Sequence, residues 1–404
     1  MTEEKSIFAK IKEGLIVLFL VFKEELRSVF KDTGALIFFF LLPLCYPLIY
    51  AFIYDNEVMH EAKLVVVDES ATAMSRDFIR RMDATADVQV VQTCTDMAEA
   101  KHLMDKKEAY GILHFPSSFS DDVHKGIQTR VQLYSDMSAL LFYKSFMLAA
   151  TEVSFEVARN FQKSIHPAST EQLQKITIDP IPYDSIAMFN PQGGFSSFIV
   201  PAILVLIIQQ TLVLGICMLG GTARERSPYQ SIIPADAHYH GTLRILLGKS
   251  FAYSLLYIVV CIWIFAFVPK LFSLPQIGYP MDIICFLIPY VLAAIFMSIT
   301  LSGFMISRES PMLIFVFASV ILLFISGISW PKEAIPWYWR AVGYLFPSTP
   351  AIQGFVRLNS TGANLQDVLP EYRLLWFQCG AYFISSFIVY RKQIIKLKEK
   401  QKGL

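Results

Sequence analysis

Six long apolar runs constrain the fold of this 404-residue chain more than any other feature of its sequence. They cover residues 33–54, 195–220, 245–268, 283–307, 312–329 and 374–390. A helix that crosses the hydrocarbon core of a bilayer needs about 20 mostly apolar residues. Within lipid, backbone groups must find their hydrogen bonds inside the segment, so each run is predicted to be a helix despite its valine and isoleucine content. We therefore expect an α-helical polytopic membrane protein with six transmembrane helices.

Charged residues divide the chain into two unlike parts. Residues 55–190 hold 13 basic and 20 acidic side chains, whereas the remaining 268 residues hold 22 basic and 14 acidic ones and contain every long apolar run. The net charge of +1 averages these two parts. This distribution argues against a soluble enzyme, a disordered chain and nucleic-acid binding through overall basicity. We expect one water-exposed domain, inserted between the first and second helices.

The basic residues near the ends of the runs predict how the helices cross the membrane. With the N-terminus in the cytoplasm, the inner segments 1–32, 221–249, 307–311 and 391–404 carry 17 Lys and Arg in 80 residues. The short outer loops, 269–282 and 330–373, then carry 5 in 58. Because Lys and Arg gather on the cytoplasmic side, both termini are expected there. Residues 55–190 then form an extracytoplasmic domain, and residues 191–404 contain helices 2–6.

The segment 1–32 is predicted to contain an interfacial helix ahead of the first span. Its apolar stretch, residues 15–22, is too short to cross a bilayer but suits a helix that lies in the membrane interface. Basic residues flank that stretch on both sides: Lys10, Lys12, Lys23, Arg27 and Lys31. A signal peptide is the alternative, but no small-residue cleavage site follows Tyr54. We expect the first span, residues 33–54, to be retained as an anchor.

The extracytoplasmic domain is predicted to be α/β. Short β-branched and aromatic runs at 63–68, 87–92, 110–115 and 130–134 alternate with segments 70–84, 95–107 and 117–125, each of which begins with a Ser or Thr suited to a helix N-cap. Strands that alternate with helices favour a largely parallel sheet. Residues 136–163 are predicted to form one long helix, and residues 167–191 return the chain to the membrane.

Catalytic and metal-binding patterns have little support in this domain. His102, His114 and His124 have spacings that fit no compact ligand motif, and no cysteine or carboxylate cluster completes a set, so we interpret them as surface histidines. Five of the six cysteines lie in apolar runs, which leaves Cys94 without a disulfide partner in the domain. We predict no catalytic residues, no metal and no cofactor for this chain.

The interiors of the apolar runs contain almost no charge. Their polar residues have two interpretations: hydrogen bonding between helices, or the lining of a pathway for an amphiphilic substrate. The pathway candidates are Gln209, Gln210, Thr211, Tyr253, Tyr257, Ser298 and Ser302. Transport coupled to protons or sodium usually requires buried ionisable groups. Their absence indicates that energy comes from a partner.

Residues 241–250 end like a phosphate-binding P-loop, with Gly241 followed by Gly248-Lys249-Ser250. The motif needs four residues between its glycines and a preceding strand, whereas here six residues separate the glycines and an apolar run follows. We conclude that this chain does not bind ATP through that motif.

Several local patterns, taken in order, resemble the membrane (permease) subunit of type-2 ABC exporters, of the multidrug-type subfamily with a large extracytoplasmic domain. In the outer domain these are residues 109–120 (AYGILHFPSSFS) and 131–136 (VQLYSD). Residues 188–191 (MFNP) and 198–201 (FIVP) lead into the second span. Two further groups are Arg224-Glu225-Arg226 with Pro234 and Gly248-Lys249, and the Gly/Pro-punctuated segment around Gly327.

This resemblance implies roles for particular residues. Coupling to the ATPase is implied for the inner loop 221–249, at Arg224, Glu225, Arg226, Pro234, Gly248 and Lys249. An outer gate with a short re-entrant helix is implied for the loop 330–373 and its approach, at Gly327, Trp330, Pro331, Pro336, Trp337 and Pro347. The sequence departs from the family pattern at Ser227-Pro228-Tyr229-Gln230, so the position of the coupling element is better supported than its contacts.

The resemblance also implies partners. Cytoplasmic ATPase subunits would bind ATP and Mg, a second permease copy or homologous permease would complete the pathway, and a periplasmic membrane-fusion adaptor with an outer-membrane channel would contact the outer domain. The implied location is the bacterial inner membrane, in contact with its lipid, and the implied activity is export of drugs, lipids or lipid-linked glycans, with no nucleic acid involved. The alternative is a membrane-anchored sensor or assembly factor whose outer domain binds a ligand or partner.

Overall fold

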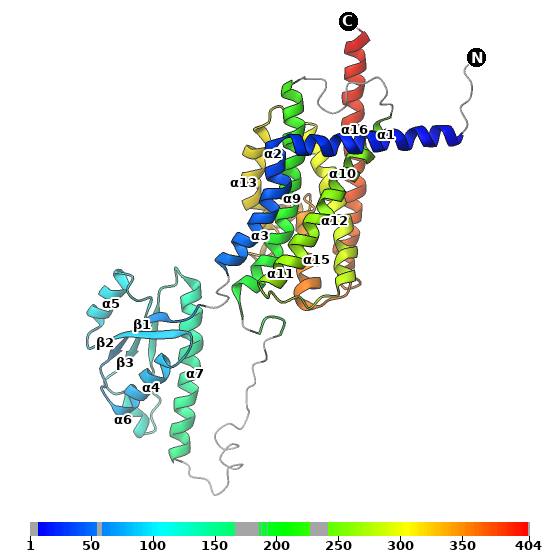
Figure 1. Ribbon diagram of the computed structural model, residues 1–404. Coiled ribbons are helices and arrows are strands. Elements are labelled where there is room, and N and C mark those ends of the chain that lie inside the picture. Colours follow the sequence, from blue (N-terminus) through cyan, green and yellow to red (C-terminus); the bar gives the residue numbers. More distant parts are fainter. Residues whose placement is uncertain are drawn as a thin grey trace, which may run out of the picture. The chain divides into compact units, whose positions relative to one another are not determined.

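The computed structural model describes residues 7–54, 59–165, 186, 188–191, 193–226 and 241–402 (Figure 1). The chain divides into two compact units. One consists of Met1–Glu57 with Ala187–Leu404, and the other of Val58–Ile186. We call them the helical unit and the α/β unit.

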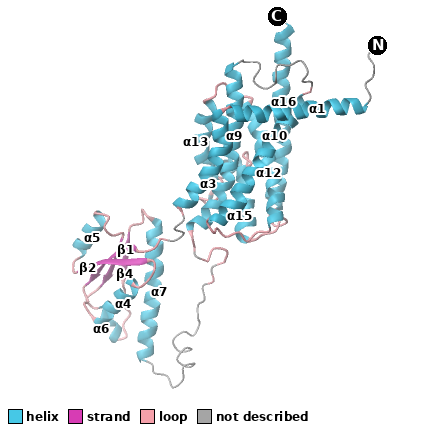
Figure 2. Cartoon of the chain, viewed as in Figure 1, coloured by secondary structure: helices cyan, strands magenta, loops and turns pink. Residues whose placement is uncertain are grey.

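A four-stranded sheet forms the centre of the α/β unit. Its strands are β1 (Ala62–Asp68), β2 (Val88–Cys94), β3 (Gly111–Phe115) and β4 (Gln132–Ser135), in the order β2-β1-β3-β4 (Figure 2). β1 runs parallel to β2 and β3, and β4 runs antiparallel to β3. The four strands overlap the four runs predicted from the sequence, and the largely parallel sheet is confirmed.

Helices cover both faces of this sheet. Successive side chains of β1 point to opposite faces of the sheet, so Leu64 and Val66 lie on one face and Val65 and Val67 on the other. The first face packs against α4 (Ala73–Asp83), α6 (Phe119–His124) and α7 (Leu140–Ile165), and the second packs against α5 (Met97–Asp105). The long helix α7 contributes Phe146, Ala149 and Val153 to the core.

The helical unit is a bundle around α9 (Phe195–Arg226). This helix packs against α3 (Leu42–Ile53), α12 (Pro280–Ser302), α13 (Ser310–Ile325) and α15 (Ser348–Thr361), while α12 also packs against α16 (Leu369–Lys402). The remaining elements are α1 (Ile7–Lys31), α2 (Thr33–Leu36), η1 (Ile37–Leu41), α10 (Thr242–Ile262), η2 (Trp263–Phe267), α11 (Val268–Leu271), η3 (Lys332–Ala334) and α14 (Trp337–Gly343).

Four helical stretches of the described chain are long and apolar enough to cross a membrane: Thr33–Ile53, Phe195–Glu225, Thr242–Leu271 and Pro280–Ser302. The fifth predicted run corresponds to α13, a shorter apolar helix of 16 residues. The sixth lies within the 34-residue helix α16. A polytopic membrane protein is therefore supported, with four of the six expected spans meeting this length and composition standard.

Helix α1 lies across the end of the bundle from which the C-terminal part of α16 emerges (Figure 1). A buried stripe at four-residue spacing, Val17, Val21, Glu25 and Val29, runs along α1, and the helix packs against α10. The opposite side exposes Leu15 and Phe19. Such a helix suits the membrane interface, with one side held by protein and the other in contact with lipid.

Candidate functional site

Lys249 of α10 forms a buried ion pair with Glu25 of α1. Its Nζ lies 2.9 Å from Glu25 Oε2, and the two side chains are 13% and 11% exposed. The hydroxyl of Tyr253, one turn further along α10, donates a hydrogen bond to Glu25 Oε1. The carboxylate is thus satisfied on both oxygens, as a buried charge must be.

Gly248 explains how α1 comes close enough to α10 for this pairing. A Cβ at this position would lie 2.9 Å from the backbone oxygen of Leu18 and 2.9 Å from the side chain of Val21. Carbon atoms do not approach other heavy atoms so closely without displacement, so a larger residue would push α1 away. The Gly248-Lys249 pair noted in the sequence is therefore the packing point of α1 on α10.

Arg224, in the last turn of α9, binds the end of α12. Its guanidinium donates to the backbone oxygen of Met305 at 2.5 Å and to that of Gly303. Gln393 of α16 donates to the same Gly303 oxygen at 3.0 Å. Gly303 is the C-cap of α12 and Met305 lies in the turn that follows it, where carbonyls have no partner within the helix. Arg224 and Gln393 supply donors there and join three helices.

Glu225 extends this contact toward the first helices. Its Oε1 accepts a hydrogen bond from the backbone N–H of Arg308 at 2.8 Å, and Arg308 Nη2 lies 2.9 Å from Asp32 Oδ1. Asp32 in turn caps α2 by accepting from the N–H groups of Gly34 at 2.9 Å and Ala35 at 3.1 Å. We call Glu25, Asp32, Arg224, Glu225, Lys249 and Arg308 together the charged network.

The charged network contains three of the six coupling candidates, and a fourth packs beside it. Arg224, Glu225 and Lys249 belong to it and Gly248 supports it, whereas Pro234 and the side chain of Arg226 lie outside the described residues. The sequence interpretation missed Glu25, Asp32 and Arg308. One signal was available, because Glu25 interrupts a stripe of valines at four-residue spacing, where an isolated charge needs a buried partner.

Deep in the bundle, Gln209 of α9 caps the start of α15. Its Oε1 accepts from the Ser348 N–H at 2.7 Å and its Nε2 donates to Ser348 Oγ at 3.0 Å. The Thr349 N–H bonds to the Phe346 oxygen at 3.2 Å, and Pro350 has no N–H to satisfy. These contacts allow α15 to begin inside the bundle, because its first donors are all satisfied. The segment 330–373, expected to be a loop with a short re-entrant helix, thus contains α14 and a largely buried α15.

The other pathway candidates fall into two groups. Tyr257 donates to Thr211 Oγ1 at 2.9 Å, and Ser298 and Ser302 donate to backbone oxygens of their own helix, all in buried positions. Gln210 differs. The residue is half-buried, and its Oε1, which is itself buried, has no hydrogen-bond partner among the described residues.

The gate candidates lie around α14. Gly327 has φ +92°, a conformation that favours glycine, and Gln353 donates to the adjacent Ser326 oxygen at 3.0 Å. Trp330 is 59% exposed and Trp337 is 75% exposed. Prolines occupy the N-cap positions of the three helical segments that follow, with Pro331 before η3, Pro336 before α14 and Pro347 before α15.

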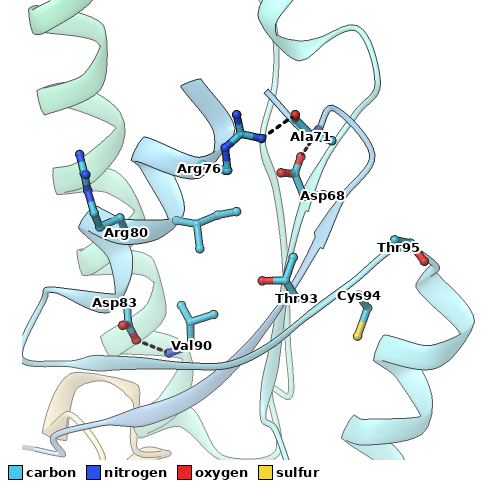
Figure 3. A pocket seen from close by; sticks show the side chains of 10 residues that line it. Asp68, Ala71, Arg76, Arg80, Asp83, Val90, Thr93, Cys94 and Thr95 are labelled. Carbon is cyan, nitrogen blue, oxygen red and sulfur yellow. Dashed lines mark hydrogen bonds between the residues drawn. The ribbon is translucent and has the colours of Figure 1, made fainter. Parts of the chain in front are cut away.

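The α/β unit contains a hollow of about 580 Å³ between α4 and β2, which Figure 3 shows with its lining side chains. Its acidic residues serve the fold. Asp68 accepts from the N–H groups of Ser70 and Ala71 and from the hydroxyl of Ser75, and Asp83 accepts from the Val90 N–H at 2.8 Å. Burial raises the pKa of the Cys94 thiol to about 11, so it is protonated at neutral pH and a poor nucleophile.

The three histidines considered as metal ligands, His102, His114 and His124, have local roles or surface positions. His114 Nε2 lies 3.1 Å from Glu69 Oε1, and His124 Nδ1 lies 2.7 Å from the Ser120 backbone oxygen. Within the described ranges, no group of three or more His, Cys, Asp or Glu side chains is placed to hold a metal ion. Neither the hollow nor the histidines forms an arrangement that would support catalysis.

Comparison with known families gives one result that covers most of the chain. Residues 34–388 match the model of a family described as ABC-2 family transporter protein. A search of curated proteins finds no match. The matched range includes both units, from α2 of the helical unit to α16. The chain therefore belongs to the ABC-2 transporter family, as a membrane subunit of the kind that associates with an ATPase.

Proposed function

We propose that this chain is the permease subunit of an ATP-driven exporter in a bacterial inner membrane, and that the charged network receives the motion of the ATPase. The observation that carries this proposal is the way charge is distributed in the helical unit. The network joins α1, α9, α10 and the turn after α12 at one end, while polar groups between the helices deeper inside are neutral.

The charged network suits mechanical coupling for a physical reason. Helix α1 is anchored within its length by Glu25, which pairs with Lys249 of α10, and at the residue that follows it by Asp32, which pairs with Arg308. A displacement of α1 therefore reaches the spans through ion pairs rather than through lipid. Basic residues of α1 at this end include Lys23, Arg27 and Lys31, which supports a cytoplasmic position facing the ATPase. A conformational change needs only different contacts in two states.

The neutral interior indicates the class of substrate. Of the seven pathway candidates, Gln210 is the one that combines partial exposure with an unpartnered amide oxygen. We assign it the role of contacting substrate, and we assign the other six to helix packing. An uncharged, aromatic-rich surface favours a hydrophobic or amphiphilic molecule such as a drug, a lipid or a lipid-linked glycan over a small ion.

The proposal also assigns roles to the exposed tryptophans near α14 and to the α/β unit. The exposed Trp330 and Trp337 suit the level of the lipid headgroups, where an aromatic ring is half wet, and mark the outer gate. The α/β unit then lies outside the cytoplasm and binds a periplasmic adaptor that leads to an outer-membrane channel. A second permease copy completes the pathway.

ATP-driven transport in vesicles tests the proposed function. The chain would be co-purified with its ATPase subunits, reconstituted and supplied with a panel of fluorescent amphiphiles. We expect ATP-dependent movement of at least one amphiphile that is insensitive to dissipation of proton and sodium gradients. Gln210→Ala should change the order of preference within the panel while leaving assembly intact. Transport driven by an ion gradient without ATP would contradict the proposal.

A further inference from the structure

Helix α7 of the α/β unit has two apolar faces, and the fold uses only one of them. Phe146, Ala149 and Val153 pack against the sheet. On another side of the helix, Leu141, Leu148 and Phe155 are 45%, 50% and 67% exposed. These three side chains are seven residues apart, which is the spacing of helices that pair along their length. We call residues 141, 144, 148, 151, 152 and 155 the α7 stripe.

Three further exposed positions of α7 support this pattern. Leu140 and Met147 lie beside the α7 stripe and are also exposed, and Thr151 supplies a small side chain between Leu148 and Phe155. The outward face of a helix in a water-exposed domain is normally polar. Five large apolar side chains are exposed on this side of α7, namely Leu140, Leu141, Met147, Leu148 and Phe155, and they indicate a surface that another macromolecule covers.

Two charges of opposite sign flank the middle of the α7 stripe. Lys144 lies four residues before Leu148 and Glu152 lies four residues after it, and both are exposed. Neither forms an ion pair with any residue that the structure describes. Their positions, equally distant from Leu148, are what a self-complementary contact requires.

We propose that the α7 stripe pairs with the same stripe of a second copy of this chain, antiparallel, with Leu148 on the two-fold axis. In this register Leu148 meets Leu148 of the partner subunit, Leu141 meets Phe155 of the partner subunit, and Lys144 meets Glu152 of the partner subunit. A two-fold interface uses the same patch on both subunits. The contact between residues 141 and 155 and the contact between residues 144 and 152 therefore each occur twice. A parallel arrangement in register would instead place like charges opposite each other.

The charges also argue for this occupant over a lipid surface. Helices that bind anionic lipid carry an excess of Lys and Arg on their polar margin. The α7 stripe carries one cation and one anion at matched positions, which gives no net attraction to a charged membrane but makes two complementary pairs with its own copy. The inference rests on the proposed function, because that proposal brings two copies together in one complex.

A single cysteine at the predicted axis tests this pairing in the full complex with its ATPase subunits. Leu148→Cys should form a dimer on mild oxidation, because the two thiols would meet across the axis. Asn160→Cys is the matched control: it is also exposed on α7, and the two copies of residue 160 would lie about 36 Å apart in this register. The wild-type chain, with its six native cysteines, measures the background.

Charge changes then test the register. In the Leu148→Cys background, Lys144→Glu or Glu152→Lys should lower the yield of cross-linked dimer by about two- to fivefold, and the double exchange should restore it. Equal cross-linking at positions 148 and 160, or an intramolecular or adaptor cross-link at 148, would overturn the inference. Native mass spectrometry separates the two proposals: two copies without the 148 cross-link would refute only the α7 pairing, whereas one copy would also refute the paired permease.

Discussion

The two kinds of polar contact in the helical unit differ in place and in charge. At the end where α1 lies, the contacts are ionic and join elements that are far apart in sequence, such as Lys249 with Glu25 and Arg308 with Asp32. Inside the bundle the contacts of Gln209 with Ser348 and of Tyr257 with Thr211 are neutral, and a further ion pair, Arg357 with Glu371, joins α15 to α16. The first kind suits a site that changes partners when the ATPase moves. The second kind suits helices that must stay packed in lipid.

The largest effect is expected from Lys249→Met. It leaves the Glu25 carboxylate buried with a single remaining hydroxyl partner, and removing one member of a buried ion pair typically costs about 3–5 kcal/mol. The midpoint of thermal unfolding in detergent should fall by several degrees. The exchange Glu25→Lys with Lys249→Glu should recover part of the loss, and an unchanged midpoint for Lys249→Met would show that the pair contributes nothing to docking of α1.

Arg224→Gln should have the next largest effect, about 1–3 kcal/mol, because it leaves carbonyl groups at the end of α12 with fewer donors. Hydrogen exchange of residues 303–308 should become faster. Arg224→Lys keeps the charge but loses the fork that reaches two oxygens, so it should recover only part of the protection. Full protection in the lysine variant would mean that charge alone matters at this position.

Gln209→Leu and Gln210→Leu compare neighbouring residues in the neutral interior. The first removes the cap of α15 and should lower the free energy of unfolding by about 1–3 kcal/mol. The second removes an amide whose oxygen has no partner within the described structure, and it should change stability by less than about 0.5 kcal/mol. Urea or thermal unfolding of the two variants in the same detergent measures the difference, and equal losses would refute the distinction between capping and pathway residues.

The smallest effect is expected for Asp77, a partly exposed residue of the α/β unit that forms ion pairs outside the charged network. Hydrogen bonding from Arg81 holds the pKa of Asp77 below its ordinary value of 3.8, and Arg80 adds to this. The ionised Asp77 carboxylate therefore stabilises the folded state above about pH 3.8. This contribution is lost as the pH falls through the lower pKa that Asp77 has in the folded state. Asp77→Asn should lower stability slightly near pH 6 and not below pH 3. A loss of stability that is the same at both pH values would contradict this assignment.

The sequence predicts elements better than it predicts the contacts between them. The apolar runs and the alternating β-branched runs identify the long helices and the four strands because hydrophobic period depends on near neighbours. The buried start of α15 was not predictable in this way, because its cap, Gln209, lies 139 residues earlier in the chain. From the residues alone this proline- and aromatic-rich segment is interpreted as a loop, and the short helix expected there is implied only by the family resemblance.

In the candidate site, too, the sequence identified residues but not the distant residues that they contact. Gly248-Lys249 and Arg224-Glu225 were identified from a resemblance, but their partners were not, because Glu25 lies 228 residues before Tyr253 and Asp32 lies 276 residues before Arg308. Glu25 also resembles an ordinary charge on an interfacial helix until its burial is known. Among the pathway candidates, Gln209 and Gln210 look alike in the sequence. Burial and hydrogen bonding separate them, because Gln209 is buried and bonds to Ser348, whereas Gln210 is half-buried and its Oε1 has no partner in the described structure.

Substrate-stimulated ATPase activity of Arg224→Glu, measured in the assembled and reconstituted complex, tests most directly whether the charged network couples the two subunits. Reversing this charge repels Glu225 and removes the bonds to the end of α12. We predict that the basal rate of ATP hydrolysis is retained, whereas stimulation by substrate is largely lost. Stimulation equal to that of the wild-type complex, in a variant that assembles normally, would contradict a coupling role for the network.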